Sequence, residues 1–205
     1  MSAFAERRIG AEMPVTVNEA AFLAGVTIKM VNQAIDREHV QARPLRRSTD
    51  RAARGVDAST ALFLSFSSLL APELRAKVYR RFRGKTLPEL PRRIELGAIV
   101  IDLRQAIVNF ERRLELLMRI GERIEMDPEV RGGDPVFAGT RVPVYAIARK
   151  IELGSTAEEL AEDYPRLREE DFDLATQYAR VYPRRGRPRA EWTRAMERAE
   201  DARGA

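Results

Sequence analysis

The sequence contains no cysteine and a single histidine, His39, among its 205 residues. Disulfide bonds, thiolate nucleophiles and zinc sites built from several His or Cys ligands are therefore excluded. His39 follows a predicted helix without an accompanying Ser, Cys or second His, so we interpret it as a surface or phosphate-contacting residue and not as a catalytic base. We accordingly expect a protein that is not an enzyme, holds no metal or other cofactor and has no small-molecule substrate.

Long hydrophobic runs are also missing. The longest apolar stretch, Ala61 to Leu70, is broken by three serines, and none approaches the roughly 20 residues that span a bilayer. The first ten residues do not combine a basic region, an apolar core and a cleavage site, so no secretory signal is evident. These observations predict a cytoplasmic protein with no membrane partner.

Charge of one sign dominates different parts of the chain, which carries +5 overall. Residues 1–125 hold 22 Lys and Arg against 15 Asp and Glu, residues 126–183 hold 7 against 12, and residues 184–205 hold 7 against 4. A basic front half indicates a polyanionic partner, whereas the acidic segment and the basic tail indicate different roles for the other end.

Two short helices are predicted near the N-terminus. The first is capped by Thr16 or Asn18 and ends at Gly25, and Thr27 can cap the second. The residues of the second helix that are expected to face inward are Met30 or Val31, Ala34 and Ile35. The arginine-rich segment that follows, with Pro44 and Gly55, suits a hairpin or wing.

The segment from Val17 to Asp36 meets the steric demands of a DNA-binding helix-turn-helix, with small Ala21 where the helices cross and Gly25 in the turn. Asn and Gln can read adenine edges, while Thr and Lys suit phosphate or guanine contacts. The expected DNA-binding residues of the second helix are Thr27, Ile28, Lys29, Asn32 and Gln33. Those expected in the wing, against the DNA backbone or a minor groove, are Arg43, Arg46, Arg47, Arg51 and Arg54.

About 45 residues of this region resemble the winged helix-turn-helix of excisionase and MerR-like proteins. The alternative is that two small helices merely meet at a glycine, as in tri-helical domains that do not bind DNA. Asp36 opposes the DNA interpretation, because a carboxylate that faces phosphate is repelled.

The middle of the chain is predicted to be mostly helical. An apolar helix over 61–70 and a basic helix to Arg83 are followed by a linker, Gly84 to Pro91, and a short strand over 98–101. A longer helix then carries apolar residues at steps of four and three, which are Leu103, Ile107, Phe110, Leu114 and Leu117. This stripe is either a dimer interface or part of the core of the chain itself.

The C-terminal region is predicted to contain a short β-hairpin and three helices. Turn residues around Ala138 and Gly139 favour the hairpin. One helix should run from Pro143 to Leu153, a second from the Thr156–Glu159 capping box to Tyr164, and a third from Glu169 to Tyr182.

Four short motifs of this region carry a family resemblance: Pro128 to Val144, Gly154 to Leu160, Asp163 to Leu167, and Tyr178-Ala179. Together they resemble, over about 55 residues, a small three-helix family of VapB-type antitoxins that are the partners of PIN-like toxins. Arg168 departs from the pattern, because a Thr or Ser is expected to cap the third helix there. The four carboxylates at the start of that helix suit its N-terminus but oppose contact with DNA, so we expect dimerisation or protein contact instead.

The resemblance implies a toxin partner, and the tail offers groups to bind it. A mobile arginine could replace the charge of Mg²⁺ among the carboxylates of a PIN-like nuclease. The expected toxin-binding residues are Arg184, Arg185, Arg187, Arg189, Trp192 and Met196. The alternative is a disordered tail that aids solubility or touches DNA.

We therefore predict a mainly α protein with an N-terminal winged helix-turn-helix and a C-terminal three-helix domain with a short β-hairpin. The expected parts are a DNA-binding region (1–83), a linker and long helix (84–123), a VapB-like domain (124–182) and an arginine-rich tail (183–205). The predicted function is that of a homodimeric antitoxin that inhibits a PIN-like ribonuclease toxin and represses its own operon at operator DNA.

Two alternatives stay open. The first is a free-standing helix-turn-helix regulator without a toxin partner. The second is an enzyme, whose candidate carboxylates are Asp127, Asp134, Asp163 and Asp171. Because these four residues lie at predicted turns and helix caps, structure alone accounts for them.

Overall fold

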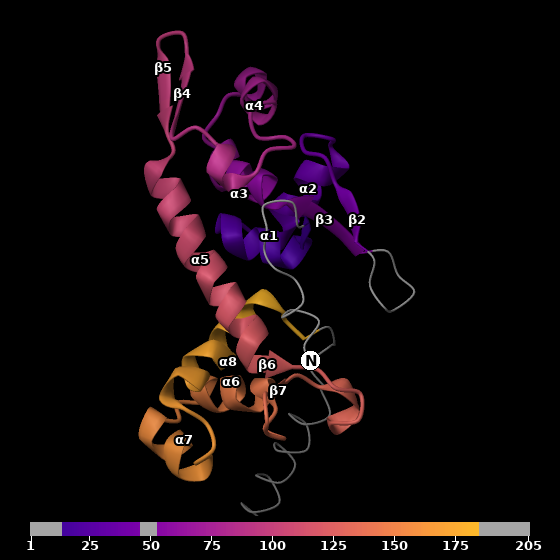
Figure 1. Cartoon of the computed structure of the whole chain (residues 1–205), viewed down its shortest axis with the longest axis vertical. Coiled ribbons are helices and arrows are strands. Elements are labelled where there is room, and N and C mark those ends of the chain that lie inside the picture. Colours follow the sequence, from indigo (N-terminus) through magenta and orange to yellow (C-terminus); the bar gives the residue numbers. More distant parts are fainter. Residues whose placement is uncertain (1–13, 46–52, 185–205) are drawn as a thin grey trace, which may run out of the picture.

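The computed structural model describes residues 14–45 and 53–184. Within these residues the chain is mainly helical, with eight α-helices and small antiparallel sheets. In Figure 1 the N-terminal helices lie in the upper part, the C-terminal helices in the lower part, and helix α5 runs along one side between them. None of the described helices combines the length and the apolar character needed to cross a membrane.

The first two helices form as their caps predict. Strand β1 (Pro14–Thr16) leads into α1 (Val17–Ala24), and α2 (Ile28–Asp36) follows after a short turn. The Thr16 hydroxyl accepts a hydrogen bond from the Glu19 N–H, and the Glu19 carboxylate accepts one from the Thr16 N–H at 2.7 Å. Gly25 then ends α1 with a φ of 69°, the left-handed conformation that glycine adopts at low cost.

In the arginine-rich region, two paired strands flank residues 46–52. Strands β2 (Arg43–Leu45) and β3 (Ala53–Asp57) pair antiparallel, and β1 pairs with the other edge of β3. The resulting sheet has the order β1-β3-β2. The hairpin β2–β3 follows α2 in the sequence and lies beside it in the structure (Figure 1).

Two more helices complete the N-terminal part. Helix α3 (Ala58–Ser67) is buried along nearly its whole length, and α4 (Pro72–Tyr79) begins at a proline. The aromatic rings of Phe63, Phe66 and Phe82 pack with centroid separations of 5.7 Å and form the centre of this part. Such contacts between buried aromatic rings stabilise a core beyond their area alone.

A second hairpin projects from the top of the molecule (Figure 1). After the short 3-10 helix η1 (Leu87–Glu89), strands β4 (Arg93–Leu96) and β5 (Ile99–Asp102) pair antiparallel. The strand expected at 98–101 is therefore present, but its partner β4 was not predicted. An Arg-Arg pair and a nearby proline make the sequence of β4 look like a continuation of the linker.

Helix α5 (Arg104–Arg123) buries the apolar stripe that was considered as a dimer interface. Ile107, Phe110 and Leu117 are buried in the same continuous core as the residues of α1, α3 and α8. The stripe therefore belongs to the core of the chain, and the second of the two alternatives holds.

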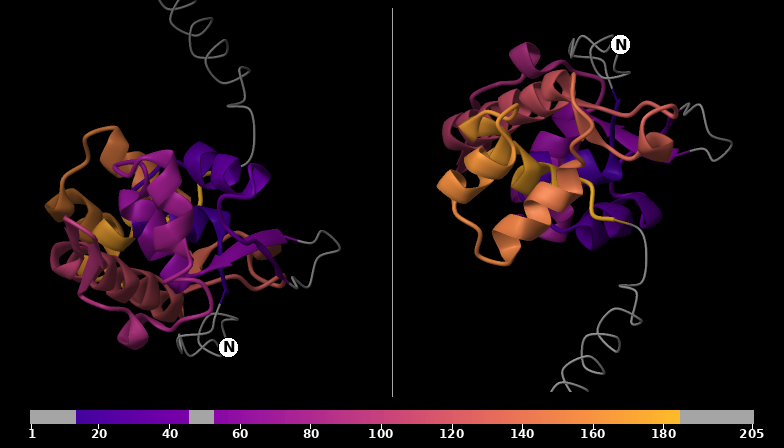
Figure 2. Two further views of the ribbon diagram at one scale, coloured as in Figure 1. Left: turned by 90° about the horizontal axis from the view of Figure 1, so that it is seen from above. Right: turned by 90° about the horizontal axis from the view of Figure 1, so that it is seen from below.

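The C-terminal part contains the three expected helices, α6 (Val144–Glu152), α7 (Ala157–Asp163) and α8 (Glu169–Val181). The expected hairpin is corrected in one respect. Strand β7 (Val136–Phe137) pairs mainly with β6 (Ile124–Glu125), and a single bridge joins Val136 to Pro143 across the turn at Gly139. The 3-10 helix η2 (Arg131–Gly133) lies between β6 and β7. Figure 2 shows α6, α7 and α8 gathered beside the end of α5 in the view from below.

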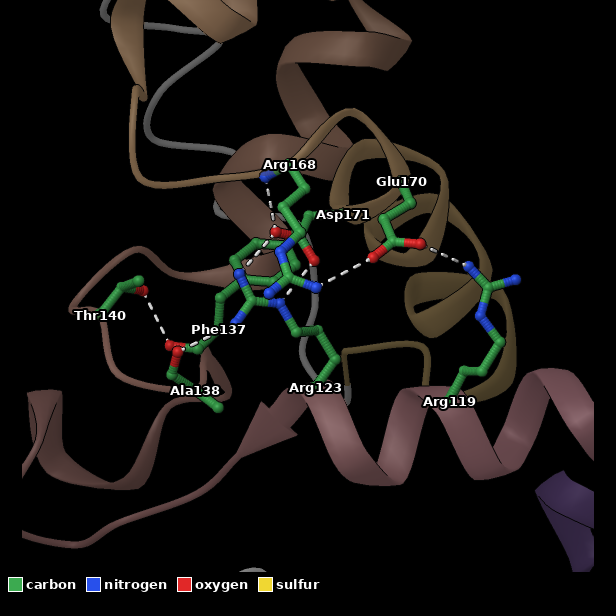
Figure 3. A network of polar contacts seen from close by, with 8 residues as sticks. All are labelled: Arg119, Arg123, Phe137, Ala138, Thr140, Arg168, Glu170 and Asp171. Atoms are coloured by element: carbon green, nitrogen blue, oxygen red, sulfur yellow. Dashed lines mark hydrogen bonds and ion pairs between the residues drawn. The ribbon is translucent and has the colours of Figure 1, made fainter.

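One buried ion pair joins these elements, and Figure 3 shows it from close by. Arg123 at the end of α5 donates two hydrogen bonds of 2.7 Å to the carboxylate of Asp171, whose side chain is fully buried, and a third to the carbonyl of Ala138. Asp171 also accepts a hydrogen bond of 2.8 Å from the N–H of Arg168. The side chain of Asp171, in the first turn of α8, therefore forms one half of a capping box with the N-cap residue Arg168.

The same contacts set the charge of Asp171. Burial would raise the pKa of its carboxyl group, but the hydrogen bonds from Arg123 and from the Arg168 N–H outweigh burial and hold the pKa below its usual 3.8. A carboxylate with a lowered pKa in the folded state stabilises the fold at neutral pH, and this contribution is lost as the pH falls from the unfolded pKa through the folded pKa.

We expect Asp171→Asn to lower the free energy of unfolding by about 2 to 4 kcal/mol at pH 7, because it leaves Arg123 without its partner in a mostly buried site. Asp173→Asn is the matched control, since Asp173 is an exposed carboxylate on the same helix. Urea denaturation from pH 7 to pH 3 measures both. The free energy of unfolding of Asp171→Asn should also fall less steeply below pH 4 than that of the wild type, because the variant lacks the carboxylate that titrates there. Equal stability of the two variants would contradict the role given to the ion pair.

Candidate functional site

The outer face of α2 carries the residues expected to read DNA. Lys29 and Gln33 are exposed to solvent, and Asn32 is half-buried. Thr27 accepts a hydrogen bond of 3.2 Å from the Met30 N–H, so its hydroxyl group caps the helix. Ile28 is also half-buried and packs against the core, so it is not a fully outward residue.

A bridge that the sequence did not predict connects this face with the hairpin β2–β3. The guanidinium group of Arg54 donates to the carboxylate of Asp36 at 2.5 Å and to the side-chain oxygen of Asn32 at 3.1 Å. The Arg54 and Asp36 side chains are 49% and 58% exposed, so the ion pair itself adds little stability. Its effect is mainly electrostatic: Arg54 connects the hairpin to α2 and compensates the charge of Asp36, which had opposed a nucleic-acid site.

The other wing arginines fall into two groups. Arg43 forms an ion pair with Asp57, with Nε and Oδ1 3.0 Å apart. Arg46, Arg47 and Arg51 lie outside the described residues. Of the five predicted wing residues, the structure therefore brings Arg54 to the face of α2 and holds Arg43 on its own sheet.

The turn between α1 and α2 is held from outside by α5. The Arg113 side chain donates a hydrogen bond of 3.0 Å to the carbonyl of Leu23, one of the last carbonyls of α1. A cation at this position also interacts favourably with the negative end of the helix dipole. The guanidinium group lies directly against Gly25, where a Cβ atom would come within 2.5 Å of an Arg113 nitrogen.

A second connection joins α1 to the end of α8. The Glu19 carboxylate, only 4% exposed as a residue, accepts a hydrogen bond of 2.6 Å from the Tyr182 hydroxyl in addition to the one from Thr16. The Tyr145 hydroxyl donates at 2.5 Å to the Tyr182 carbonyl. Burial raises the pKa of the Tyr145 phenol, so the phenol stays protonated and can donate this bond at neutral pH.

The predicted toxin-binding tail begins at this connection. The guanidinium group of Arg184 lies 4.6 Å from the centre of the Tyr145 ring and 3.5 Å from Asp134. A cation over an aromatic face is attracted to it. The remaining residues of the predicted site lie outside the described part of the chain, and they are Arg185, Arg187, Arg189, Trp192 and Met196.

The four carboxylates considered for an enzyme each contact a different partner, which for Asp134 is Arg184. Asp127 accepts from the N–H of Glu129 within its own turn, Asp163 pairs with Lys150, and Asp171 pairs with Arg123. Across residues 14–45 and 53–184, no group of three or more acidic or histidine side chains is placed to hold a metal ion.

Sequence reasoning found α2 and its polar face but missed the three contacts that orient them. Arg54, Arg113 and Glu19 each bind a group far away in the sequence. Two of them had a local signal: Asp36 is a carboxylate on a face expected to be basic, and Glu19 lies among apolar residues of α1. Arg113 had none, since a charged residue beside an apolar stripe is usual for a surface helix.

We expect Gly25→Ala to be more destabilising than Gly97→Ala by about 1 kcal/mol, because only the first displaces Arg113 from its hydrogen bond to the Leu23 carbonyl. Gly97 is a matched control: its φ is 68° and nothing lies within 4 Å of an added Cβ, so both variants carry the same backbone strain. Chemical denaturation compares them. In an Arg113→Ala background the difference between the two glycine variants should disappear, and its persistence there would refute the role of Arg113.

Known sequences are similar to the C-terminal part of this chain and to most of its length. Residues 124–179 match a family described as protein of unknown function (DUF433). Over 191 residues the chain is 32% identical to the uncharacterized protein y4eO of Sinorhizobium fredii, a match that covers 87% of this chain and 86% of that protein.

Two solved structures are also similar. A crystal structure of a DUF433 member protein from Anabaena variabilis has 29% identity, covers 36% of this chain and 72% of its own, and has a TM-score of 0.29. The crystal structure of Rv2018 from Mycobacterium tuberculosis has 17% identity, covers 82% of this chain and 99% of its own, and has a TM-score of 0.35.

Proposed function

We propose that this chain, which belongs to the same protein family as y4eO of Sinorhizobium fredii and contains a DUF433 domain, is an antitoxin that binds operator DNA and inhibits a PIN-like ribonuclease. The observation that carries the DNA-binding part is the bridge from Arg54 to Asp36 and Asn32. It joins α2 and the hairpin β2–β3 into one surface, with a polar helix face beside strands that carry Arg43 and Arg54.

The arrangement of these elements supports a winged helix-turn-helix. Helix α1, a glycine turn, helix α2 and an antiparallel hairpin follow one another in the order of that motif. Lys29 and Gln33 are exposed on α2, where one suits phosphate or guanine and the other an adenine edge. The hairpin would then serve as the wing that contacts the DNA backbone.

The antitoxin part rests on the resemblance of the motifs from Pro128 to Ala179 to VapB-type antitoxins. The geometry supports it at one point: Arg184, the last described residue, is held over Tyr145 close to the end of α8. A tail that starts from a fixed position can place its arginines and Trp192 in the carboxylate-lined site of a nuclease without losing contact with the domain.

The test has two arms that report on the two partners separately. Gln33→Ala should weaken binding to the chain's own promoter fragment about tenfold and leave binding to a scrambled duplex unchanged, because a base contact carries 1 to 3 kcal/mol of discrimination as an order of magnitude. Gln105→Ala, an exposed glutamine on α5, is the control. Electrophoretic mobility shift measures this arm.

In the second arm, a chain that ends at Pro183 should lose the complex with the nuclease encoded beside it and no longer protect cells from it, while it retains DNA binding. Copurification and growth assays measure this arm. A wild-type chain that binds its promoter but never a neighbouring nuclease would be a free-standing regulator. A chain that binds neither would overturn the proposal.

The proposal includes a homodimer, since two half-sites give the specificity that one short helix lacks. With the stripe of α5 buried, the interface must lie elsewhere. Ile99 and Val100 on the hairpin β4–β5 and Val108 on α5 are 48%, 57% and 54% exposed, which is high for β-branched apolar residues. Further along α5, Arg112 and Glu115 are exposed with opposite charges, so two antiparallel copies of the helix could pair them.

We therefore expect the double substitution Ile99→Lys and Val100→Lys to convert a dimer to a monomer, because it places charges in the centre of the proposed contact. Leu69→Lys, at an exposed apolar residue beyond α3, is the control and should leave the mass unchanged. Sedimentation equilibrium gives the mass of each. A dimer that persists in the double variant, or a wild-type chain that is monomeric at every concentration, would exclude this interface.

A further inference from the structure

A hollow beside the helix-turn-helix brings together basic residues from two distant helices. It is lined by α1 and the turn after it, by Arg113 of α5, and by Gln177 and Arg180 of α8. Asn18 and Thr27 add polar side chains from the N-terminal part. The described residues that line it include two arginines and no carboxylate, although α8 itself begins with a run of acidic residues.

The two arginines differ in how they are engaged. Arg113 uses one guanidinium nitrogen for the Leu23 carbonyl, which leaves its other donors available. Arg180 is exposed at the C-terminal end of α8 and forms no ion pair within the described part of the chain. Two guanidinium groups beside neutral hydrogen-bonding side chains match the charge and the several acceptor oxygens of a phosphate group.

The hollow adjoins the face of α2 that is proposed to read DNA. Thr27 and Ile28 belong both to its lining and to the predicted DNA-binding residues. A phosphate bound there would therefore sit next to the N-terminal turn of α2, where the helix dipole also favours an anion. The acidic start of α8 does not oppose this, because even its nearest carboxylate, Asp173, is seven residues, or about 10 Å, from Arg180 along the helix.

We propose that this hollow binds a phosphate group of the DNA backbone, so that α8 of the C-terminal domain is part of the DNA-binding surface. This inference rests on the proposed function only in requiring that the chain binds DNA. The C-terminal domain, which the charge of its sequence assigns to protein contact, then also sets the position of α2 on the duplex through Arg180. Contacts to phosphate position a protein without reading sequence.

The experiment measures how DNA affinity depends on salt in the full-length chain. Each phosphate that a protein neutralises contributes about 0.9 to the slope of log K against log salt concentration. Arg180→Gln should therefore reduce the magnitude of the slope by about one, equally on the promoter fragment and on a scrambled duplex. Arg149→Gln is the matched control: Arg149 is an exposed arginine of the same domain, pairs with Glu152 and does not line the hollow.

Circular dichroism first establishes that both variants are folded, which is expected because both side chains are exposed. Equal slopes for the wild type and Arg180→Gln would overturn the inference. If inorganic phosphate raises the melting temperature of the wild type but not of Arg180→Gln while the slopes agree, the hollow binds a free anion and the DNA-backbone assignment is wrong.

The proposed function can fail separately. A wild-type chain that binds both duplexes equally would contradict operator recognition, yet the slope of the Arg180→Gln variant would still decide the phosphate site. A wild-type chain with no affinity for any duplex would overturn both.

Discussion

Helix α5 imposes the constraint on which the rest of the structure depends, because its single apolar stripe belongs to two halves of the core. Ile107 and Phe110 lie in its first half and Leu117 and Ile120 in its second, and all four are buried in one continuous cluster with residues of the N-terminal and C-terminal parts. If either half separated from α5, part of the stripe would be exposed to water. Each Å² of apolar surface exposed in this way would cost about 25 cal/mol of stability. The two parts of the chain therefore pack against one helix.

Polar contacts then fix how each half sits on that helix. In the middle of α5, Arg113 binds the Leu23 carbonyl next to the turn at Gly25. At the end of α5, Arg123 binds the buried carboxylate of Asp171. The hydrogen bond from the Tyr182 hydroxyl to the Glu19 carboxylate connects the end of α8 directly with α1. Because these bonds involve ionised groups in mostly buried places, each is stronger than a neutral surface bond. The orientation of α2 relative to α8 is accordingly determined by packing on α5 together with directed bonds, and not by packing alone.

The elements that the sequence predicted are those with local signals. Each helix cap depends on residues at most four positions apart, so the sequence could place the helix ends. These signals are the caps at Thr16 and Thr27, the glycine at Gly25 and the capping box at Thr156. Strand β4 and the pairing of β7 with β6 could not be placed in this way, because strand pairing depends on a partner elsewhere in the chain.

The same distinction applies to the candidate site. The polar face of α2 follows from helical periodicity, which needs only the segment itself. The contacts of Arg54 with Asp36 and Asn32 join residues that are 18 or more positions apart, and Arg113 and Arg180 line one hollow from two distant helices. A charged side chain gives no sequence signal of which distant group it meets, so the surface could be predicted in its residue types but not in its geometry.

The distribution of charge along α8 shows why net charge is a poor guide to the role of this domain. Its acidic first turn is largely satisfied within the protein: Asp171 is bound to Arg123, and Glu170 lies 3.3 Å from Arg119. Both carboxylates also complement the positive end of the helix dipole. Arg180, in the last turn, is the charge that the helix presents beside the turn of α1 and α2. A segment with a net charge of −5 can therefore offer a basic group to the proposed phosphate, because only charges within about a Debye length, roughly 8 Å, act strongly on a phosphate there.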